Sequence, residues 1–316
     1  MSETGGPDPE PYPSETVGNQ QAAERRNRLI IAGSAVAVVV IIVVSFFAVK
    51  ASTGKKRPPA AATTASPAAR PSASPAQAAA LAALTSIPTS VTDAVGSGGS
   101  QVEGKPLAIP GQPLTANGKP EVFYAGAEFC PFCAAQRWSI ILALSRFGTF
   151  SGVQPIRSAA ADGAGNSESY PNTATWTFYG SSYTSSYLTF TPVETLTNIP
   201  DPSTGSYTKL QTPTKAQQAL IGKWDASPYV PSGESGAIPF IDFGGKYIMA
   251  GAGYSPGLLA SMSWSQIAAA TANPATPIAK GAGGTANYIT AALCKLTGNQ
   301  PASACTGAVQ ALAGHI

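Results

Sequence analysis

Residues 122–144 read VFYAGAEFCPFCAAQRWSIILAL, and they contain the strongest local signal of structure in the chain. The run 122–124 is short and apolar, as in a buried strand, and the spacing of the apolar residues in 138–144 predicts a helix that stops at Gly148. Segment 153–160 predicts a second strand. A strand, a helix and a strand in about 40 residues indicate a βαβ unit with a right-handed crossover.

The motif Cys130-Pro131-Phe132-Cys133 joins the first strand to the helix. A cysteine at the N-cap, followed by proline at the first helical position, has its sulfur beside unpaired backbone N–H groups at the positive end of the helix dipole. This environment stabilises a thiolate, so Cys130 is the candidate nucleophile. Cys133 lies one turn later and can attack a mixed disulfide on Cys130, so it is the candidate resolving thiol.

A zinc site and a haem attachment site are two other uses of this motif, and both are less consistent with the sequence. A structural disulfide is a third use, and it stays open. A zinc site needs a second close cysteine pair or histidines, but the only histidine is His315. Covalent haem attachment needs histidine after the second cysteine, and Ala134 stands there. We therefore expect no metal and no cofactor. A purely structural Cys130–Cys133 disulfide remains the alternative to a redox dithiol.

Two charged residues flank the motif. Arg137 lies one turn beyond Cys133 and could favour a thiolate, whereas Glu128 precedes the motif and could exchange a proton with Cys133. The alternative for each is an ordinary solvated surface charge.

The rest of the chain adds strands and helices. Block 176–193 is rich in aromatic residues and threonine, as in strands, and its aromatic side chains either line a peptide groove or belong to the core. A helical pattern follows at 219–224, and segment 238–249, with two glycines at its centre, predicts a β-hairpin. Pro239 stands at the start of the first hairpin strand, an unusual place for a residue without an N–H unless its peptide bond is a special one. An ordinary trans-proline at a strand edge is the alternative. From Pro256 onward the pattern is helical with glycine-rich breaks.

The other two cysteines, Cys294 and Cys305, enclose a short segment between two helical patterns. We expect a structural disulfide that stabilises the fold by about 3 kcal/mol through the loop it closes. A second redox pair that relays electrons to Cys130 and Cys133 is the alternative. Four cysteines in two plausible pairs are typical of an oxidising compartment.

The N-terminal part divides into three segments. Residues 1–28, rich in proline and acids, predict a disordered tail. Residues 29–49 contain no charge and are long enough, at about 30 Å, to cross a bilayer as one helix; a cleaved signal peptide is the alternative. Residues 50–85, rich in Ala, Pro and Ser, predict a stalk, although the spacing in 78–95 indicates one helix or two short ones broken at Pro88.

Charge restricts the partners. Charged residues make up 11% of the 316 residues, well below the ~25% of ordinary soluble proteins. The net charge of +3 comes from the basic residues that follow 29–49, whereas residues 71–316 carry 11 charges of each sign. Without a basic face we expect no nucleic-acid partner, and the basic excess would meet lipid head groups. Positive residues flank 29–49 on both sides, so they leave its orientation open.

Several stretches together resemble a prokaryotic membrane-anchored thioredoxin-like family that is catalogued only as a domain of unknown function. The likeness extends over about residues 86–310 and rests on GAEFCPFCAAQRW (126–138), LSRFGTF (144–150), YPNTATWTFYGSSYTSSYLTFTPVE (170–194), IPFIDFGGKYIMAGAGYSP (238–256) and ALCKLTGNQPASAC (292–305).

The resemblance implies an α/β fold of the thioredoxin-like class: a βαβ unit with Cys-x-x-Cys at the helix N-terminus, then ββα. It also implies that Pro239 is the cis-proline that faces the dithiol in such folds. We expect this domain over 86–316, with a long, partly β insertion at about 161–235 that departs from the family pattern. Pro131-Phe132 resembles the dipeptide of a glutaredoxin more than that of a strong periplasmic oxidant.

Two functions follow from this sequence. The first is a membrane-anchored thiol–disulfide oxidoreductase that acts on extracytoplasmic protein thiols through Cys130 and Cys133 and is reset by an unknown redox partner. The second is a binding or assembly module whose disulfides are structural. Exposure of Cys130 discriminates between them, because a buried sulfur cannot exchange. We expect the N-terminus in the cytoplasm and the domain outside, where disulfides persist.

Overall fold

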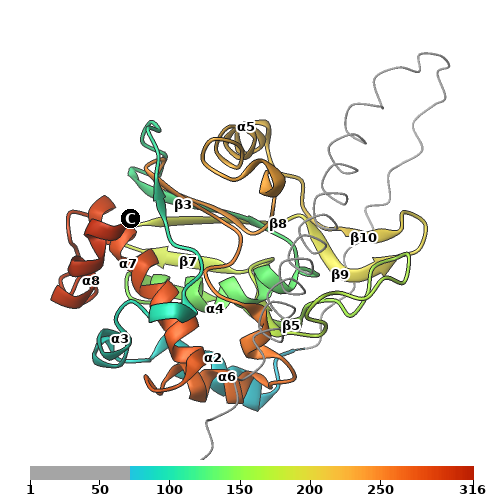
Figure 1. The fold of residues 1–316 in the computed structure, drawn as a ribbon, viewed down its shortest axis with the longest axis horizontal. Helices are drawn as coiled ribbons and strands as arrows, with labels where there is room; N and C mark the ends of the chain where they lie inside the picture. Colours follow the sequence, from blue (N-terminus) through green and yellow to red (C-terminus); the bar gives the residue numbers. More distant parts are fainter. Residues whose placement is uncertain (1–71) are drawn as a thin grey trace, which may run out of the picture.

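The computed structural model describes residues 72–316. The predicted tail at 1–28, the predicted transmembrane helix at 29–49 and most of the predicted stalk at 50–85 lie outside the described residues. The described part is a mixed α/β domain with a mixed central sheet (Figure 1).

The helices are α2 (Pro75–Thr85), α3 (Thr89–Val95), α4 (Pro131–Leu144), α5 (Lys215–Trp224), α6 (Trp264–Thr271), α7 (Gly284–Leu296) and α8 (Gly307–Leu312). Short 3-10 turns lie at Gly99–Gln101, Ser232–Glu234, Pro256–Leu259 and Ala313–His315, and a π-helical turn at Ala279–Gly283 leads into α7. The strands are β1 (Leu107–Ala108), β2 (Thr115–Ala116), β3 (Lys119–Gly126), β4 (Gly148–Ser151), β5 (Gln154–Arg157), β6 (Ala174–Thr177), β7 (Ser182–Ser185), β8 (Thr189–Glu194), β9 (Leu196–Asp201), β10 (Ser206–Lys209), β11 (Phe240–Phe243) and β12 (Tyr247–Ala250).

The central sheet is built around β3. One side of β3 pairs in parallel with β8, from Glu121 opposite Thr189 to Gly126 opposite Glu194. β11 pairs antiparallel with β3, β12 with β11 and β1 with β12. The predicted βαβ unit is therefore present, but its second strand is β8.

Segment 153–160 was predicted to be that second strand, and this prediction is wrong. β5 forms there, but it pairs antiparallel with β6 in a separate two-stranded sheet. The predicted insertion at 161–235 is corrected for the same reason, because β8 lies inside this range and belongs to the central sheet. An apolar run predicts a strand but does not say which distant strand it pairs with.

Alternation along β3 separates the two faces of the sheet. Val122 and Tyr124 belong to the large apolar cluster that also contains α4 and α7, whereas Phe123 belongs to a smaller cluster with Trp224 of α5. Successive side chains of a strand point to opposite faces, so α5 covers one face and α4 with α7 the other (Figure 1).

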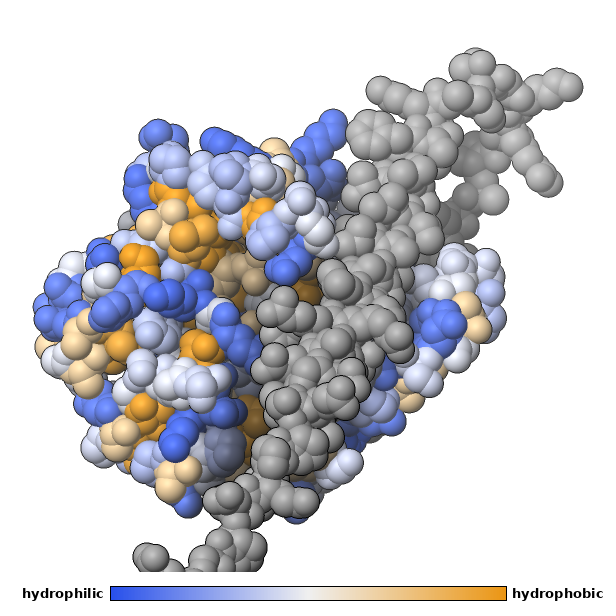
Figure 2. All heavy atoms as spheres, viewed as in Figure 1, coloured by the Kyte–Doolittle hydropathy of each residue, from blue (hydrophilic) through white to orange (hydrophobic). Residues whose placement is uncertain are grey.

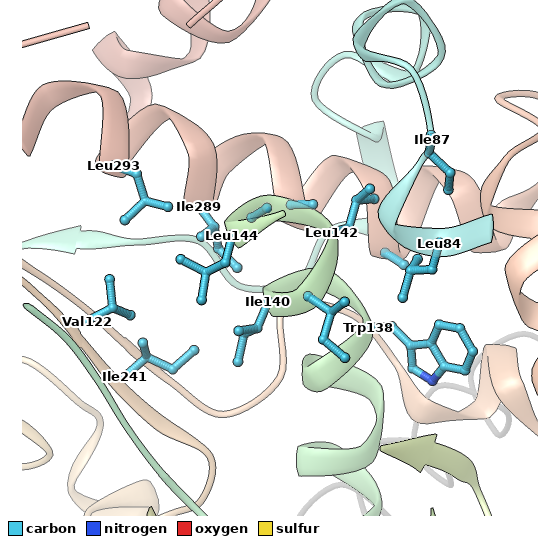
Figure 3. Packing of buried hydrophobic residues seen from close by; sticks show 14 of the residues in the cluster. Leu84, Ile87, Val122, Trp138, Ile140, Leu142, Leu144, Ile241, Ile289 and Leu293 are labelled. Atoms are coloured by element: carbon cyan, nitrogen blue, oxygen red, sulfur yellow. The ribbon is translucent and has the colours of Figure 1, made fainter. Parts of the chain in front are cut away.

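Helix α4 is the centre of the larger layer. Figure 3 shows its Ile140 and Leu144 between Ile289 and Leu293 of α7 and the sheet residue Val122. Every residue of α4 except Phe132 is buried, as expected for a helix that has apolar contacts all round. The N-terminus of α4, which carries the Cys-x-x-Cys motif, is therefore held firmly against the sheet.

The domain begins earlier than the predicted boundary at residue 86. One helix, or two short ones broken at Pro88, was predicted over 78–95, and the structure has the second alternative, as α2 and α3. Leu84 of α2 is fully buried and lies beside Trp138 of α4 (Figure 3), so α2 belongs to the packed domain rather than to the stalk.

Within residues 72–316, no individual helix has the length and hydropathy to cross a bilayer. The pair α2 and α3, bent by 72° at the break between them, meets these criteria only when the two helices are taken together.

The hairpin predicted at 238–249 is confirmed as β11 and β12. Its turn residues Gly244 and Gly245 have φ values of +62° and +68°, which side chains other than glycine's rarely allow. The Asp242 carboxylate accepts a hydrogen bond from the Gly245 N–H at 2.6 Å and fixes the turn. The turn chemistry thus makes this the most predictable part of the sheet.

Cys294 and Cys305 form a disulfide, with their Cα atoms 5.7 Å apart. It joins the end of α7 to the loop before α8, at the end of the domain opposite the β9–β10 hairpin (Figure 1). The other two cysteines are free thiols.

The surface is mixed in character. Figure 2 shows hydrophilic residues around smaller hydrophobic areas that are scattered over this face of the domain. Trp224 and Val230 are buried in the smaller cluster, with the sheet residues Phe123 and Phe240.

Candidate functional site

Cys130 occupies the N-cap of α4, as the sequence predicted. β3 ends at Gly126, and Cys130 has extended backbone angles before Pro131 starts the helix. The Cys130 Sγ accepts a hydrogen bond from the Cys133 N–H at 3.2 Å. The sulfur therefore satisfies one of the free N–H groups of the first turn and lies at the positive end of the helix dipole.

Cys133 is in a different environment from Cys130. It is fully buried, and burial raises the pKa of its thiol well above the ordinary value; the neighbouring Cys130 raises this pKa further. The charge of Arg137 acts in the opposite direction and lowers it. Cys133 is thus held as a thiol despite the charge of Arg137, which fits a resolving rather than an attacking role.

The Ile238–Pro239 segment lies against Cys130. The Ile238–Pro239 peptide bond is cis, and the Cys130 thiol donates to the Ile238 carbonyl oxygen at 3.7 Å. The Pro239 carbonyl oxygen accepts a hydrogen bond from Gly251 just after β12. The sheet thereby brings residue 238 to residue 130, more than one hundred positions away in the chain.

Arg137 is fully buried, so its interpretation as a solvated surface charge is wrong. Its Nε and Nη2 donate to the two carboxylate oxygens of Glu194 at 2.9 and 2.7 Å, and Nη2 also donates to the Ala127 carbonyl oxygen. Burial lowers the pKa of Arg137, but Glu194 more than offsets this effect, and the pKa lies well above its ordinary value. Arg137 is therefore a permanent cation one turn beyond Cys133.

Glu194 is a site residue that the sequence analysis missed. It ends β8, directly opposite Gly126 of β3, and its side chain is fully buried. The signal that could have identified it is an acid at the end of an apolar strand, but only once that strand is assigned to the central sheet.

Glu128 is also fully buried, so its interpretation as a solvated charge is wrong as well. The Thr177 hydroxyl donates to its carboxylate at 2.6 Å, and the Glu128 N–H donates to the Leu196 carbonyl oxygen. Proton exchange between Glu128 and Cys133 stays a prediction.

The aromatic block 176–193 mainly contributes to the core. Trp176, Phe178 and Phe190 are buried, and Phe178 lies edge-on to Phe190 at 5.0 Å. The core interpretation is therefore confirmed for these three residues, and they do not line a groove.

The dithiol is covered. Cys130 is 4% exposed and Cys133 is not exposed at all. Residues on either side of Cys130 contact aromatic rings from other segments: Phe129 stacks on Tyr207, and Phe132 lies edge-on to Tyr170. A sulfur this deeply buried exchanges with a protein only if its cover moves.

Among residues 72–316, no group of three or more His, Cys, Asp or Glu side chains is placed to hold a metal ion. The chemistry that the described residues offer at this site is that of two thiols, a buried cation and two buried carboxylates.

Comparison with known proteins identifies a family without assigning an activity. No curated protein and no solved structure matches the chain significantly. Residues 105–295, more than half of the chain, match the family described as Domain of unknown function (DUF929), and this segment contains the Cys130–Cys133 pair, Glu194 and Pro239. The chain therefore belongs to the DUF929 family.

Proposed function

We propose that this protein is a membrane-anchored thiol–disulfide oxidoreductase that acts on extracytoplasmic protein thiols and disulfides through Cys130 and Cys133. The observation that carries the proposal is the position of Cys130: its sulfur caps α4, Cys133 follows in the first turn, and the Pro239 segment lies against it.

The topology supports a thioredoxin-like fold. In the order β8, β3, β11, β12, the first two strands are parallel and the last two antiparallel to their neighbours. A helix that starts with the dithiol and a second helix cover one face, and α5 covers the other (Figure 1). In this interpretation the core consists of a βαβ unit followed by a ββα unit. The segments 148–185 and 196–209 are additions to this core.

The chemistry proceeds by two exchanges. The Cys130 thiolate attacks a client disulfide, so that a Cys130–client bond forms and the other client sulfur leaves as a thiolate that takes up a proton. Cys133 then loses its proton to solvent and attacks the Cys130 sulfur; the Cys130–Cys133 bond forms, and the second client sulfur leaves. Two electrons have passed to the client, and the reverse sequence oxidises a client dithiol.

Loss of Cys133 should trap clients. In the full-length Cys133→Ser protein, Cys130 still forms the mixed disulfide, but nothing resolves it, so covalent complexes should accumulate on non-reducing gels and disappear with reductant. The matched Cys130→Ser variant should trap none, because the remaining Cys133 is fully buried.

Each other outcome has a definite meaning. Trapping by Cys130→Ser alone would make Cys133 the nucleophile. Absence of trapping by either variant, with both thiols inert to alkylation after reduction, would contradict the enzyme proposal and support the second candidate, a non-catalytic binding or assembly module. The burial of Cys130 is the observation that favours that candidate.

The proposal places the domain outside the membrane, anchored through residues 29–49 with the N-terminus in the cytoplasm. The Cys294–Cys305 disulfide supports this location, since such bonds persist in oxidising compartments. Protease added to intact cells should remove residues 72–316 and spare an N-terminal epitope tag, whereas after lysis both should be digested. Protection of the domain in intact cells would contradict the location.

A further inference from the structure

Two segments lie against the residues that flank Cys130, and we call them the cap: the loop 158–173 and the β9–β10 hairpin, 196–209. Both are tied to the residues just before Cys130. The Ala159 N–H donates to the Phe129 carbonyl oxygen at 2.9 Å, and the Leu196 carbonyl oxygen accepts from the Glu128 N–H at 2.9 Å.

Aromatic side chains of the cap lie on the residues that flank the nucleophile. The Tyr207 ring stacks on Phe129, with centroids 4.1 Å apart and planes 10° from parallel. The Tyr170 ring lies edge-on to Phe132, at 5.9 Å and 84°. The cap thus covers the side chain before Cys130 and the side chain inside the Cys-x-x-Cys motif, from two separate segments.

One side-chain hydrogen bond locks the two cap segments together. The Tyr207 hydroxyl in the hairpin donates to the Glu168 carboxylate in the loop at 2.5 Å. Nearby, the Gly163 N–H donates to the Ser206 carbonyl oxygen at 2.9 Å, and a Cβ at Gly163 would collide with the Asp201 carbonyl oxygen. The loop therefore fits closely against the hairpin. Tyr207 links the two segments to the residue before Cys130, because it bonds Glu168 of the loop and stacks on Phe129.

The cap is separate from the main core. Its buried apolar residues Leu196 and Tyr207, with Ala127 and Ala159, form a small cluster that Phe129 and Ile238 complete. None of these residues belongs to the large cluster around α4. A two-stranded hairpin with a small cluster of its own is marginally stable, so it can open while the main core stays folded.

We propose that the cap is a gate with Tyr207 and Glu168 as its latch, and that it selects extended client segments with an aromatic residue next to the reacting cysteine. Opening removes Tyr207 from Phe129 and leaves Phe129 and Ile238 uncovered beside the Cys130 sulfur. A client whose aromatic side chain takes the place of Tyr207 regains that stacking and burial, whereas a polar client does not. The selectivity rests on the proposed function, but the gate does not.

The gate is tested by alkylation of the reduced full-length protein with iodoacetamide, followed at Cys130 by mass spectrometry. Tyr207→Phe keeps the stacked ring and removes only the latch, so alkylation should be about tenfold faster. Glu168→Ala should act alike, and the double variant should be no faster than either single one, because one bond is lost in all three.

The control is Tyr183→Phe, which removes a comparable hydroxyl outside the cap, one that donates to the Leu144 carbonyl oxygen at 2.9 Å. Its alkylation rate should stay within about twofold of the wild type, the range expected where no cap contact is lost. Wild-type rates in Tyr207→Phe and Glu168→Ala, or an equal rise in Tyr183→Phe, would overturn the gate.

Selectivity is tested with two synthetic peptides that carry one cysteine as a mixed disulfide with thionitrobenzoate and differ only in Phe or Ser beside it. Reduced wild-type protein should release thionitrobenzoate several-fold faster from the Phe peptide, and Phe129→Ala should lose this preference. Equal rates in the wild type would overturn the selectivity. Release from neither peptide, with faster alkylation in the latch variants, would refute thiol exchange while the gate stands.

Discussion

Arg137→Met should lower the free energy of unfolding by about 3–5 kcal/mol, the largest loss we expect from one side chain near the dithiol. The substitution keeps most of the volume but leaves the Glu194 carboxylate fully buried without its cation. The Ala127 carbonyl oxygen, which Arg137 bonds at 2.7 Å, also loses a donor. The prediction is checked by urea unfolding of wild type and variant at the same pH with the dithiol reduced.

The double variant Arg137→Met, Glu194→Met shows how much of the lost stability comes from the unpaired buried charge and how much from lost packing. Removing both charges of a buried pair is often close to neutral, so the double variant should recover most of the stability that the single one loses. Arg146→Met is the control, since this partly buried arginine donates to the neutral side chains of Thr290 and Asn287 and its loss leaves no fully buried carboxylate without a cation. A double variant as unstable as the single one would contradict the charge explanation.

The same pair bears on the dithiol. Arg137 lowers the pKa of Cys133 against the larger effect of burial, so in Arg137→Met this pKa should rise further, and resolution of a mixed disulfide should need a higher pH. A purely structural role for Arg137 would reduce stability without shifting that pH profile.

The local parts of the fold were predictable from sequence because local chemistry decides them. The N-cap cysteine followed by Pro131, the Gly244-Gly245 turn and the break at Pro88 each depend on residues a few positions apart, and each forms where it was predicted. Capping and turn geometry require particular residues at particular positions, so the signal is strong.

The long-range parts were not predictable in the same way. The strand β8 pairs with β3 across about 70 positions, and the nearer apolar segment at 153–160 has equally good strand chemistry. With β8 assigned to an insertion, Glu194 could not be placed opposite Gly126, and Arg137 had no visible partner. A buried arginine and a surface arginine look alike in a sequence until the strand that carries the counter-charge is known.

Asp225 should make the protein lose stability as the pH rises from about 4 to 7. This residue ends α5, is 3% exposed, and neither of its carboxylate oxygens has a hydrogen-bond partner among the described residues. Burial raises its pKa from 3.8 to about 7. Below pH 3.8 the Asp225 carboxyl is protonated in both the folded and the unfolded state, whereas between pH 3.8 and 7 it is protonated only in the folded state. The free energy of unfolding therefore falls as the pH rises through this range, by an amount on the order of 4 kcal/mol.

Asp225→Asn tests this sign directly, because an amide cannot ionise. The variant should be more stable than the wild type at pH 8, without that advantage at pH 4, and its unfolding free energy should depend less on pH. Some slope should remain from Asp242, whose pKa burial raises to about 6. Urea unfolding at pH 4, 6 and 8 measures both proteins. Equal slopes in Asp225→Asn and the wild type would show that the Asp225 carboxyl ionises as readily in the folded chain as in the unfolded one, contrary to its burial.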